Sequence, residues 1–225
     1  MRVRQKADLA AAPLTVNTDR EGAVQFLAPA FMTFDLAMLM RKRHKSSDVQ
    51  SIGDLEQKTH YKPGVVSGGS TANFLGRSRY SVMWSRMVAA SNRNVSFPAS
   101  VEEGVRRVRE SSDDHPYVFI GEQYTLEYHA SRKPCDLVVV KGKERVLDGE
   151  YRLAVKQGYT PAAHVDKLQA ALTKLNDSGR LDELYKKWWK DRSQCSRAPA
   201  STTITSGTAI LVPILLATLM RLSGE

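Results

Sequence analysis

The apolar run YVFIGE, residues 117–122, decides the fold class that this sequence predicts. A continuous apolar run is typical of a strand that is buried on both faces in a parallel sheet. Two more runs of this kind follow at 135–140 (CDLVVV) and 151–155 (YRLAV), and earlier apolar segments occupy 7–14 and 31–40. Helical segments separate the later strands. The sequence therefore predicts an α/β layer fold with a mostly parallel sheet, whose ligands bind at the carboxyl ends of strands.

Helix start signals support this alternation. Ser51 is predicted to cap a short helix, and Ser100 with Glu103 forms a capping-box pattern at the start of SVEEGVRRVRES. A long helix is predicted to begin at Pro161 and to end before Ser178-Gly179. Its apolar residues recur on one face at Val165, Leu168, Ala171, Leu172 and Leu175.

Composition bounds the class of protein. The chain has 225 residues, of which 42% are hydrophobic, which is enough for one globular domain or two small lobes. The net charge of +9 comes from 33 basic and 24 acidic residues, so nucleic-acid binding must be considered. The basic residues are scattered, and no aromatic side chains alternate with them to stack on bases. Nucleic acid is therefore not expected as a partner.

Catalytic and metal-binding motifs are absent from the sequence. It contains no GxSxG, no HExxH and no CxxC, and its histidines have no ligand spacing. We therefore expect no enzyme, no metal site and no cofactor. The two cysteines, Cys135 and Cys195, are either buried thiols or one disulfide. A disulfide would add roughly 4 kcal/mol of stability and would imply an oxidising, extracellular location.

The segment GGSTANF, residues 68–74, has the features of an anion-binding turn. The first N–H groups of a helix have no partner inside the helix, and the helix dipole places partial positive charge there. Glycines allow a ligand to approach, and Ser70 and Thr71 add hydroxyl donors, so a carboxylate or phosphate suits this turn. The alternative is an ordinary helix cap in which one of these hydroxyls binds only the backbone.

Two further segments carry charges at strand ends. Thr15 and Arg20 follow the predicted buried strand 7–14, and Arg20 is either a bidentate carboxylate clamp or a surface arginine. Glu122 ends a buried strand, where a carboxylate is costly unless it is paired. It is therefore either a helix cap or an acceptor for an ammonium group. Two anion sites and one cation site together suit an α-amino acid with an acidic side chain.

Seven segments of the sequence resemble the ligand-binding domain of ionotropic glutamate receptors. They occur in the family's order, cover most of residues 6–195, and include the specific P-L-T…R block and the KWW-to-Cys ending. Glutamate rather than aspartate at 122 resembles the AMPA/kainate branch. The segments are ADLAAAPLTVNTDRE, FMTFDLAMLMRK, GGSTANF, SVEEGVRRVRES, YVFIGEQYTLEY, KPCDLVVV and LNDSGRLDELYKKWWKDRSQC.

The resemblance implies a two-lobed, periplasmic-binding-protein-like clamshell with mostly parallel sheets, whose first lobe is incomplete. It implies a disulfide between the two cysteines. It assigns the amino group of the ligand to the backbone carbonyl of Pro13, the hydroxyl of Thr15 and the carboxylate of Glu122. It assigns Arg20 to the α-carboxylate of the ligand. It assigns Ser70 and Thr71 to the α-carboxylate and the side-chain carboxylate.

The chain departs from the family where the pore-forming segments would lie. The upstream part of the first lobe would also precede Met1. The apolar run at 208–220 is shorter than the ~20 residues of a spanning helix and is interrupted by Pro213. It is a truncated membrane segment, a GPI-type tail or an accidental apolar end, and we expect the first. The expected organisation is a partial first lobe at 1–42, a short linker at 43–50, the second lobe with the return to the first at 51–196, a Ser/Thr-rich linker at 197–207, and an apolar tail at 208–222.

The resemblance also implies a function. The chain is expected to be the ligand-binding part of a glutamate-gated cation channel, in which lobe closure around L-glutamate or a related amino acid drives gating. It would lie at the cell membrane with the ligand-binding part outside, held there by its C-terminal tail and beside homologous receptor subunits. The alternatives are a tethered or secreted amino-acid-binding module without a channel, and an inactive receptor fragment.

Overall fold

The computed structural model describes residues 7–45, 49–90, 93–159 and 161–195, which belong to one compact unit, 1–195. The expected linker at 197–207 and tail at 208–222 lie outside the described residues. Among the described helices, none is long and apolar enough to cross a membrane.

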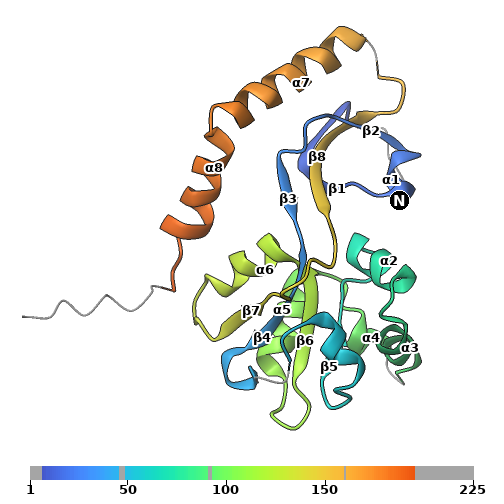
Figure 1. The fold of residues 1–225 in the computed structure, drawn as a ribbon, viewed down its shortest axis with the longest axis vertical. Coiled ribbons are helices and arrows are strands. Elements are labelled where there is room, and N and C mark those ends of the chain that lie inside the picture. Colours follow the sequence, from blue (N-terminus) through green and yellow to red (C-terminus); the bar gives the residue numbers. More distant parts are fainter. Residues whose placement is uncertain (1–6, 46–48, 91–92, 160, 196–225) are drawn as a thin grey trace, which may run out of the picture. The chain divides into compact units, whose positions relative to one another are not determined.

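The first sheet is built around one long strand, β8 (Gly149–Lys156). It pairs with β1 (Leu9–Thr15), β2 (Val24–Phe26) and β3 (Met32–Phe34), and all three pairs are antiparallel. Figure 1 shows β8 between β1 and β3. Thr15 and Tyr151 are partners in the register of β1 and β8, which places both side chains at the same end of the sheet.

The second sheet has the strand order β5-β6-β4-β7, and only one of its pairs is parallel. β5 (Lys62–Gly64) runs parallel to β6 (Tyr117–Glu122), whereas β4 (Leu36–Arg41) runs antiparallel to both β6 and β7 (Leu137–Val140). The expectation of mostly parallel sheets is therefore wrong. A continuous apolar run reports that a strand is buried on both faces, and it does not fix the direction of the strand's neighbours.

The chain passes from the first sheet to the second at Asp35, and it returns between β7 and β8. β4 thus lies in the second sheet, although its residues fall in the range 1–42 that was expected to form part of the first lobe. All its residues from Leu36 to Met40 are buried, because β4 is the inner strand between β6 and β7. The change of sheet therefore precedes the boundary that the sequence suggested.

Helices connect and cover the strands. The helix α7 (Ala162–Asp177) follows Pro161 as expected, but only part of its apolar face is covered: Val165 and Leu172 are buried, whereas Leu175 is exposed. The other helices are α1 (Thr18–Glu21), α2 (Ser70–Arg77), α3 (Ser81–Ala89), α4 (Arg93–Ser96), α5 (Val101–Glu110), α6 (Gln123–Ala130) and α8 (Arg180–Tyr185), with 3-10 turns at Lys42–His44 and Ile52–Glu56 and a π-helical turn at Lys186–Asp191.

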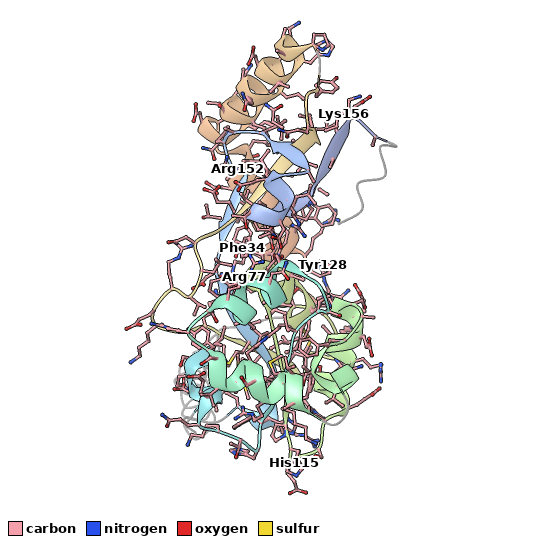
Figure 2. All side chains as sticks on the ribbon, turned by 90° about the vertical axis from the view of Figure 1, so that its right-hand side faces the viewer. Phe34, Arg77, His115, Tyr128, Arg152 and Lys156 are labelled. Carbon is pink, nitrogen blue, oxygen red and sulfur yellow. A yellow bond between two sulfur atoms is a disulfide. The ribbon has the colours of Figure 1, made fainter. Side chains whose placement is uncertain are left out.

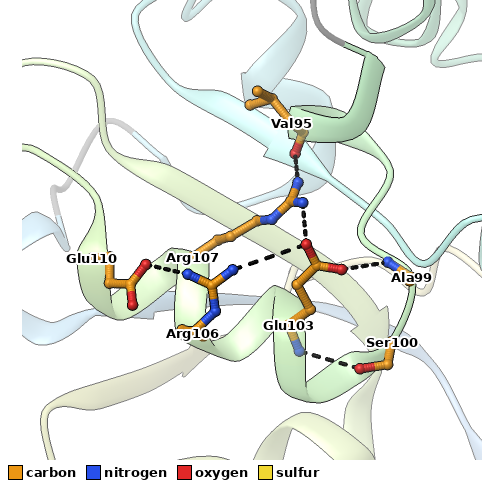
Figure 3. A network of polar contacts seen from close by, with 7 residues as sticks. All are labelled: Val95, Ala99, Ser100, Glu103, Arg106, Arg107 and Glu110. Carbon is orange, nitrogen blue, oxygen red and sulfur yellow. Dashed lines mark hydrogen bonds and ion pairs between the residues drawn. The ribbon is translucent and has the colours of Figure 1, made fainter.

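The start of α5 shows how local sequence fixes a helix end (Figure 3). The hydroxyl of Ser100 accepts a hydrogen bond from the backbone N–H of Glu103 at 3.3 Å, and the Glu103 carboxylate accepts one from the N–H of Ala99 at 2.7 Å. The bond from the N–H of Glu103 to the Ser100 hydroxyl is the expected half of a capping box. The other half differs, because the Glu103 carboxylate bonds the N–H of Ala99 rather than that of Ser100. Arg106 pairs with Glu103 and Glu110 within the same helix.

The core is unevenly divided between the two sheets. Two clusters of buried side chains pack mainly on the second sheet and include Met38, Val118 and Phe119, and the larger one extends to Phe34 and Tyr151 of the first sheet. The cluster beside the first sheet is small. β1 is largely exposed, so its expected burial is wrong: it pairs only with β8 in the described part of the chain, and an edge strand leaves side chains in water.

Cys135 and Cys195 form a disulfide, with 5.4 Å between their Cα atoms. This bond decides between the two states that the cysteine count left open. It joins the turn before β7 to the residues that follow the π-helical turn. The hydrogen bond from the guanidinium of Arg132 to the carbonyl of Arg192, at 2.8 Å, reinforces the same connection.

Candidate ligand-binding site

All six residues to which the sequence assigned a ligand line one cavity of about 200 Å³. The cavity lies where the end of β1, the start of α2 and the end of β6 meet. These three segments are far apart in the sequence and come from both sheets, so only the fold brings them together. The six residues are Pro13, Thr15, Arg20, Ser70, Thr71 and Glu122.

The carboxylate of Glu122 is the centre of the polar network. Its Oε1 accepts hydrogen bonds from the hydroxyl of Thr15 at 2.5 Å and from that of Ser70 at 3.0 Å. Its Oε2 accepts one from the hydroxyl of Tyr151 at 2.6 Å. Glu122 occupies the cap position of α6, but its side chain makes no capping hydrogen bond. The helix-cap interpretation of this carboxylate is therefore excluded, and it remains an acceptor that faces the cavity.

Tyr151 does not line the cavity, but it holds Glu122, and the sequence did not reveal this role. It lies on β8, is 4% exposed, and stacks on Phe34 with 4.3 Å between ring centroids. Burial raises the pKa of the Tyr151 phenol, and the negative charge of Glu122 raises it further, so the hydroxyl stays a donor. The only signal in the sequence was an aromatic residue at the start of a predicted strand. Its partner became visible only with the register of β1 and β8.

Arg20 lies on α1 beside the end of β1. The cap residue Asn17 accepts a hydrogen bond from the backbone N–H of Arg20 at 3.0 Å, which orients this short helix. The Nη1 group of Arg20 donates to the backbone carbonyl of Thr15 at 2.8 Å. Arg20 is a partly buried residue that lines the cavity, unlike the surface arginine of the alternative interpretation. A guanidinium has five N–H donors, so one bond to a carbonyl leaves capacity for a carboxylate.

The start of α2 brings hydroxyl and backbone donors to the cavity. α2 begins at Ser70, and its cap residue is Gly69, which has no side chain to bond the first N–H groups. The cap residue is a glycine and Ser70 directs its hydroxyl to Glu122, so the Ser70 hydroxyl is not the ordinary helix cap of the alternative interpretation. Thr71 is buried, and Gly68 has a φ of +64°, a conformation that suits glycine.

The charges of the cavity are simple. Among the described residues that line it, Arg20 is the only base and Glu122 the only acid. The other lining residues are a mixture of hydroxyl side chains, such as Thr15 and Ser70, and aliphatic ones, such as Val65 and Ile120. No group of three or more potential metal ligands occurs in the part of the chain that the structure describes. The arrangement is complementary to a small molecule that carries both a positive and a negative group.

Known proteins share the sequence pattern and the fold of this chain. Residues 3–191 match the family described as bacterial extracellular solute-binding proteins, family 3. Glutamate receptor 3 of Rattus norvegicus and of Homo sapiens are each 35% identical to the chain over 167 residues, which is 72% of this chain and 18% of the receptor. The chain thus spans less than a fifth of the length of these curated relatives.

A solved structure shares the fold. Drosophila muscle GluRIIB in complex with glutamate superimposes with a TM-score of 0.70 and 25% sequence identity, over 83% of this chain and 69% of that one. The expected periplasmic-binding-protein-like fold and the resemblance to glutamate receptors are therefore confirmed.

Proposed function

The chain belongs to family 3 of the bacterial extracellular solute-binding proteins, and from this membership we propose that its cavity binds L-glutamate or a related small amino acid. One observation carries the proposal: the six residues that the sequence assigned to such a ligand line a single cavity that has one cation and one anion. An amino acid carries a carboxylate and an ammonium group on the same carbon, and both must be paired when they leave water.

The proposed roles follow from the donors and acceptors. Arg20 holds the α-carboxylate through the N–H groups that its bond to Thr15 does not use. Glu122 accepts from the ammonium group, together with the hydroxyl of Thr15 and the carbonyl of Pro13. The hydroxyls of Thr15 and Ser70 donate to Glu122 Oε1, so an entering ammonium group would replace or reorient them.

We propose that the start of α2 binds the side-chain carboxylate of the ligand. The N–H groups that follow Gly69 and the hydroxyls of Ser70 and Thr71 are donors, and the helix dipole adds partial positive charge. A ligand with a side-chain carboxylate would use these donors, whereas glycine would not. Glutamate and aspartate are therefore expected to bind more tightly than glycine.

In a longer parent protein, the proposed role is to sense the amino acid and drive a cation channel. The support is the 35% identity to glutamate receptor 3. Binding would draw the two lobes together, and this movement would be passed to pore segments of the parent. The parent would lie in the cell membrane with this part outside and would assemble with homologous subunits. Membrane attachment through residues 208–222 is part of the same proposal.

A binding module without a channel is the second candidate. It is favoured by the family match itself, which is to solute-binding proteins and covers most of the chain. Both candidates require amino-acid binding, whereas an inactive fragment does not bind. Binding by the isolated chain is therefore the first property to measure.

The test is calorimetric titration of the oxidised chain with glutamate, aspartate and glycine. We expect saturable binding of glutamate, and we expect Arg20→Ala to weaken it by roughly 100-fold or more, because the α-carboxylate loses its charged partner. The matched control is Arg152→Ala on β8 (Figure 2). Arg152 pairs with Glu150 at 2.7 Å and does not line the cavity.

The control variant should bind as the unmodified chain does. Absence of binding by a folded, disulfide-bonded sample would exclude both binding candidates and leave the inactive fragment. Equal affinities of Arg20→Ala and Arg152→Ala would remove Arg20 from the ligand site.

A further inference from the structure

A polar contact between α1 and α2 lies outside the ligand cavity. The Oδ2 atom of Asp19 accepts a hydrogen bond from the side-chain amide of Asn73 at 3.1 Å, and Asp19 Oδ1 lies 3.6 Å from Nη2 of Arg77. Asn73 and Arg77 are four residues apart, so both project from the same face of α2. Figure 2 labels Arg77 on this helix.

The two helices belong to different halves of the fold. α1 lies between β1 and β2 of the first sheet. α2 packs on the second sheet through Ala72 and Leu75, which share a core cluster with Met38 and Val118. The contact of Asp19 therefore exists only when the two halves are close together, unlike an ion pair within one helix.

The contact also borders the space beside the ligand cavity. A second cavity, of about 310 Å³, shares Thr15 and Ser70 with the ligand cavity. Asp19, Asn73 and Arg77 line this second cavity and do not line the first. Asp19 is also the neighbour of Arg20, and Asn73 follows Ser70 and Thr71 on α2. Movement of Asp19 away from α2 would therefore separate the elements that carry the proposed ligand residues.

We propose that Asp19, Asn73 and Arg77 form a latch between the two halves of the fold, and that this latch slows the release of a bound amino acid. The three are positioning residues, because none of them lines the ligand cavity. The proposal rests on the amino-acid binding proposed above. A ligand held between α1, α2 and β6 leaves when these elements separate, so a contact that must break first lowers the dissociation rate.

The exposure of the latch side chains limits how much the latch slows release. The side chains of Asp19 and Arg77 are 53% and 70% exposed, so water and salt screen their attraction. We expect Asp19→Ala to raise both the dissociation rate and the Kd for glutamate by roughly 2- to 10-fold, with little change in the association rate. The difference should shrink as salt is added.

The matched control is Arg106→Ala, which removes ion pairs within α5 alone (Figure 3). Its glutamate kinetics should equal those of the unmodified chain. The double variant Asp19→Ala/Arg77→Ala should be no weaker than Asp19→Ala by itself, because both changes remove the same contact. The exchanged pair Asp19→Arg/Arg77→Asp should recover part of the lost affinity.

A measurement without ligand separates this proposal from the one on which it rests. Spin labels on Lys167→Cys of α7 and Glu110→Cys of α5, which are exposed helix positions, report the distance between the two halves. Without ligand, Asp19→Ala should shift the distances between the labels to longer values. Arg152→Ala is the control for this measurement, because Arg106 pairs with the labelled position Glu110. If the unmodified chain binds no amino acid, the proposed function fails and the distances alone decide whether the contact is a latch. Unchanged distances, or unchanged glutamate release in Asp19→Ala at low salt, would overturn the latch.

Discussion

Tyr151 and Glu122 are joined by a hydrogen bond of 2.6 Å although they belong to different sheets. Thr15, the partner of Tyr151 in the register of β1 and β8, donates to the other carboxylate oxygen. One end of the first sheet thus supplies two donors to a single carboxylate of the second. The connection between the sheets and the candidate ligand site therefore depend on the same residues.

The first prediction concerns Tyr151→Phe. The substitution keeps the ring that stacks on Phe34 and removes only the hydroxyl. Glu122 then loses one of its hydrogen bonds, and we expect the free energy of unfolding to fall by about 1–2 kcal/mol. Urea unfolding measures the change. Tyr128→Phe is the control, because Tyr128 is 40% exposed and its ring still contacts Arg132 after the substitution. Equal losses in the two variants would contradict the role of this hydroxyl.

The second prediction concerns Asp35, which ties together both connections between the sheets. Its carboxylate accepts backbone hydrogen bonds from Leu36 at 2.7 Å, Leu147 at 2.8 Å and Val146 at 3.0 Å. Asp35→Ala leaves these three N–H groups without their acceptor, so we expect a loss of about 1–3 kcal/mol in urea unfolding. Asp35→Asn retains one acceptor oxygen and should lose less. If both variants unfold like the unmodified chain, the carboxylate does not hold the two connections.

The third prediction tests the close approach of α5 to β6. A Cβ atom added to Gly104 would lie 2.5 Å from the ring of Phe119, which is 1% exposed. Gly104→Ala should therefore destabilise the fold by about 1–3 kcal/mol, as overpacking does. Gly22→Ala is the comparison, because no atom lies within 4 Å of its Cβ position and its φ is −71°. That variant should be neutral or slightly more stable in thermal unfolding. The packing account predicts opposite outcomes for the two, and similar melting temperatures would refute it.

The fourth prediction concerns pH. Burial lowers the pKa of His129, and the positive charges of Arg109 and Arg132 act in the same direction, while Glu102 opposes them. The unfolded chain therefore binds a proton at a higher pH than the folded chain does, and stability rises with pH where this occurs. The stability that the neutral form of His129 contributes to the fold is complete above about pH 6.5, and it is lost as the pH falls below that value.

Melting temperatures at pH 7.5 and pH 5.5 measure this dependence. His129→Gln removes the titrating group and should flatten the difference between the two values. A difference that persists unchanged in His129→Gln would assign the dependence to other groups.

The sequence alone determined the features that depend on near neighbours. The start of α7 after Pro161, the caps at Ser51 and Ser100, and the helix start at Ser70 are read from adjacent residues, because caps and turns are made by side chains within a few positions. Five of the six candidate ligand residues also followed from local chemistry at strand ends and at a helix start, whereas Pro13 came only from the resemblance. Their convergence on one cavity was implied only by that resemblance.

Tertiary structure decided everything that depends on distant partners. Strand direction in the second sheet follows from β4, an inner strand whose neighbours lie about a hundred residues further along the chain, and an apolar pattern carries no record of direction. Tyr151 reaches Glu122 only because β8 pairs in register with β1, and Asp19 meets Asn73 only because the fold brings α1 to α2. Side-chain chemistry is a local property of the chain, whereas the pairing of a donor with an acceptor depends on how the whole chain folds.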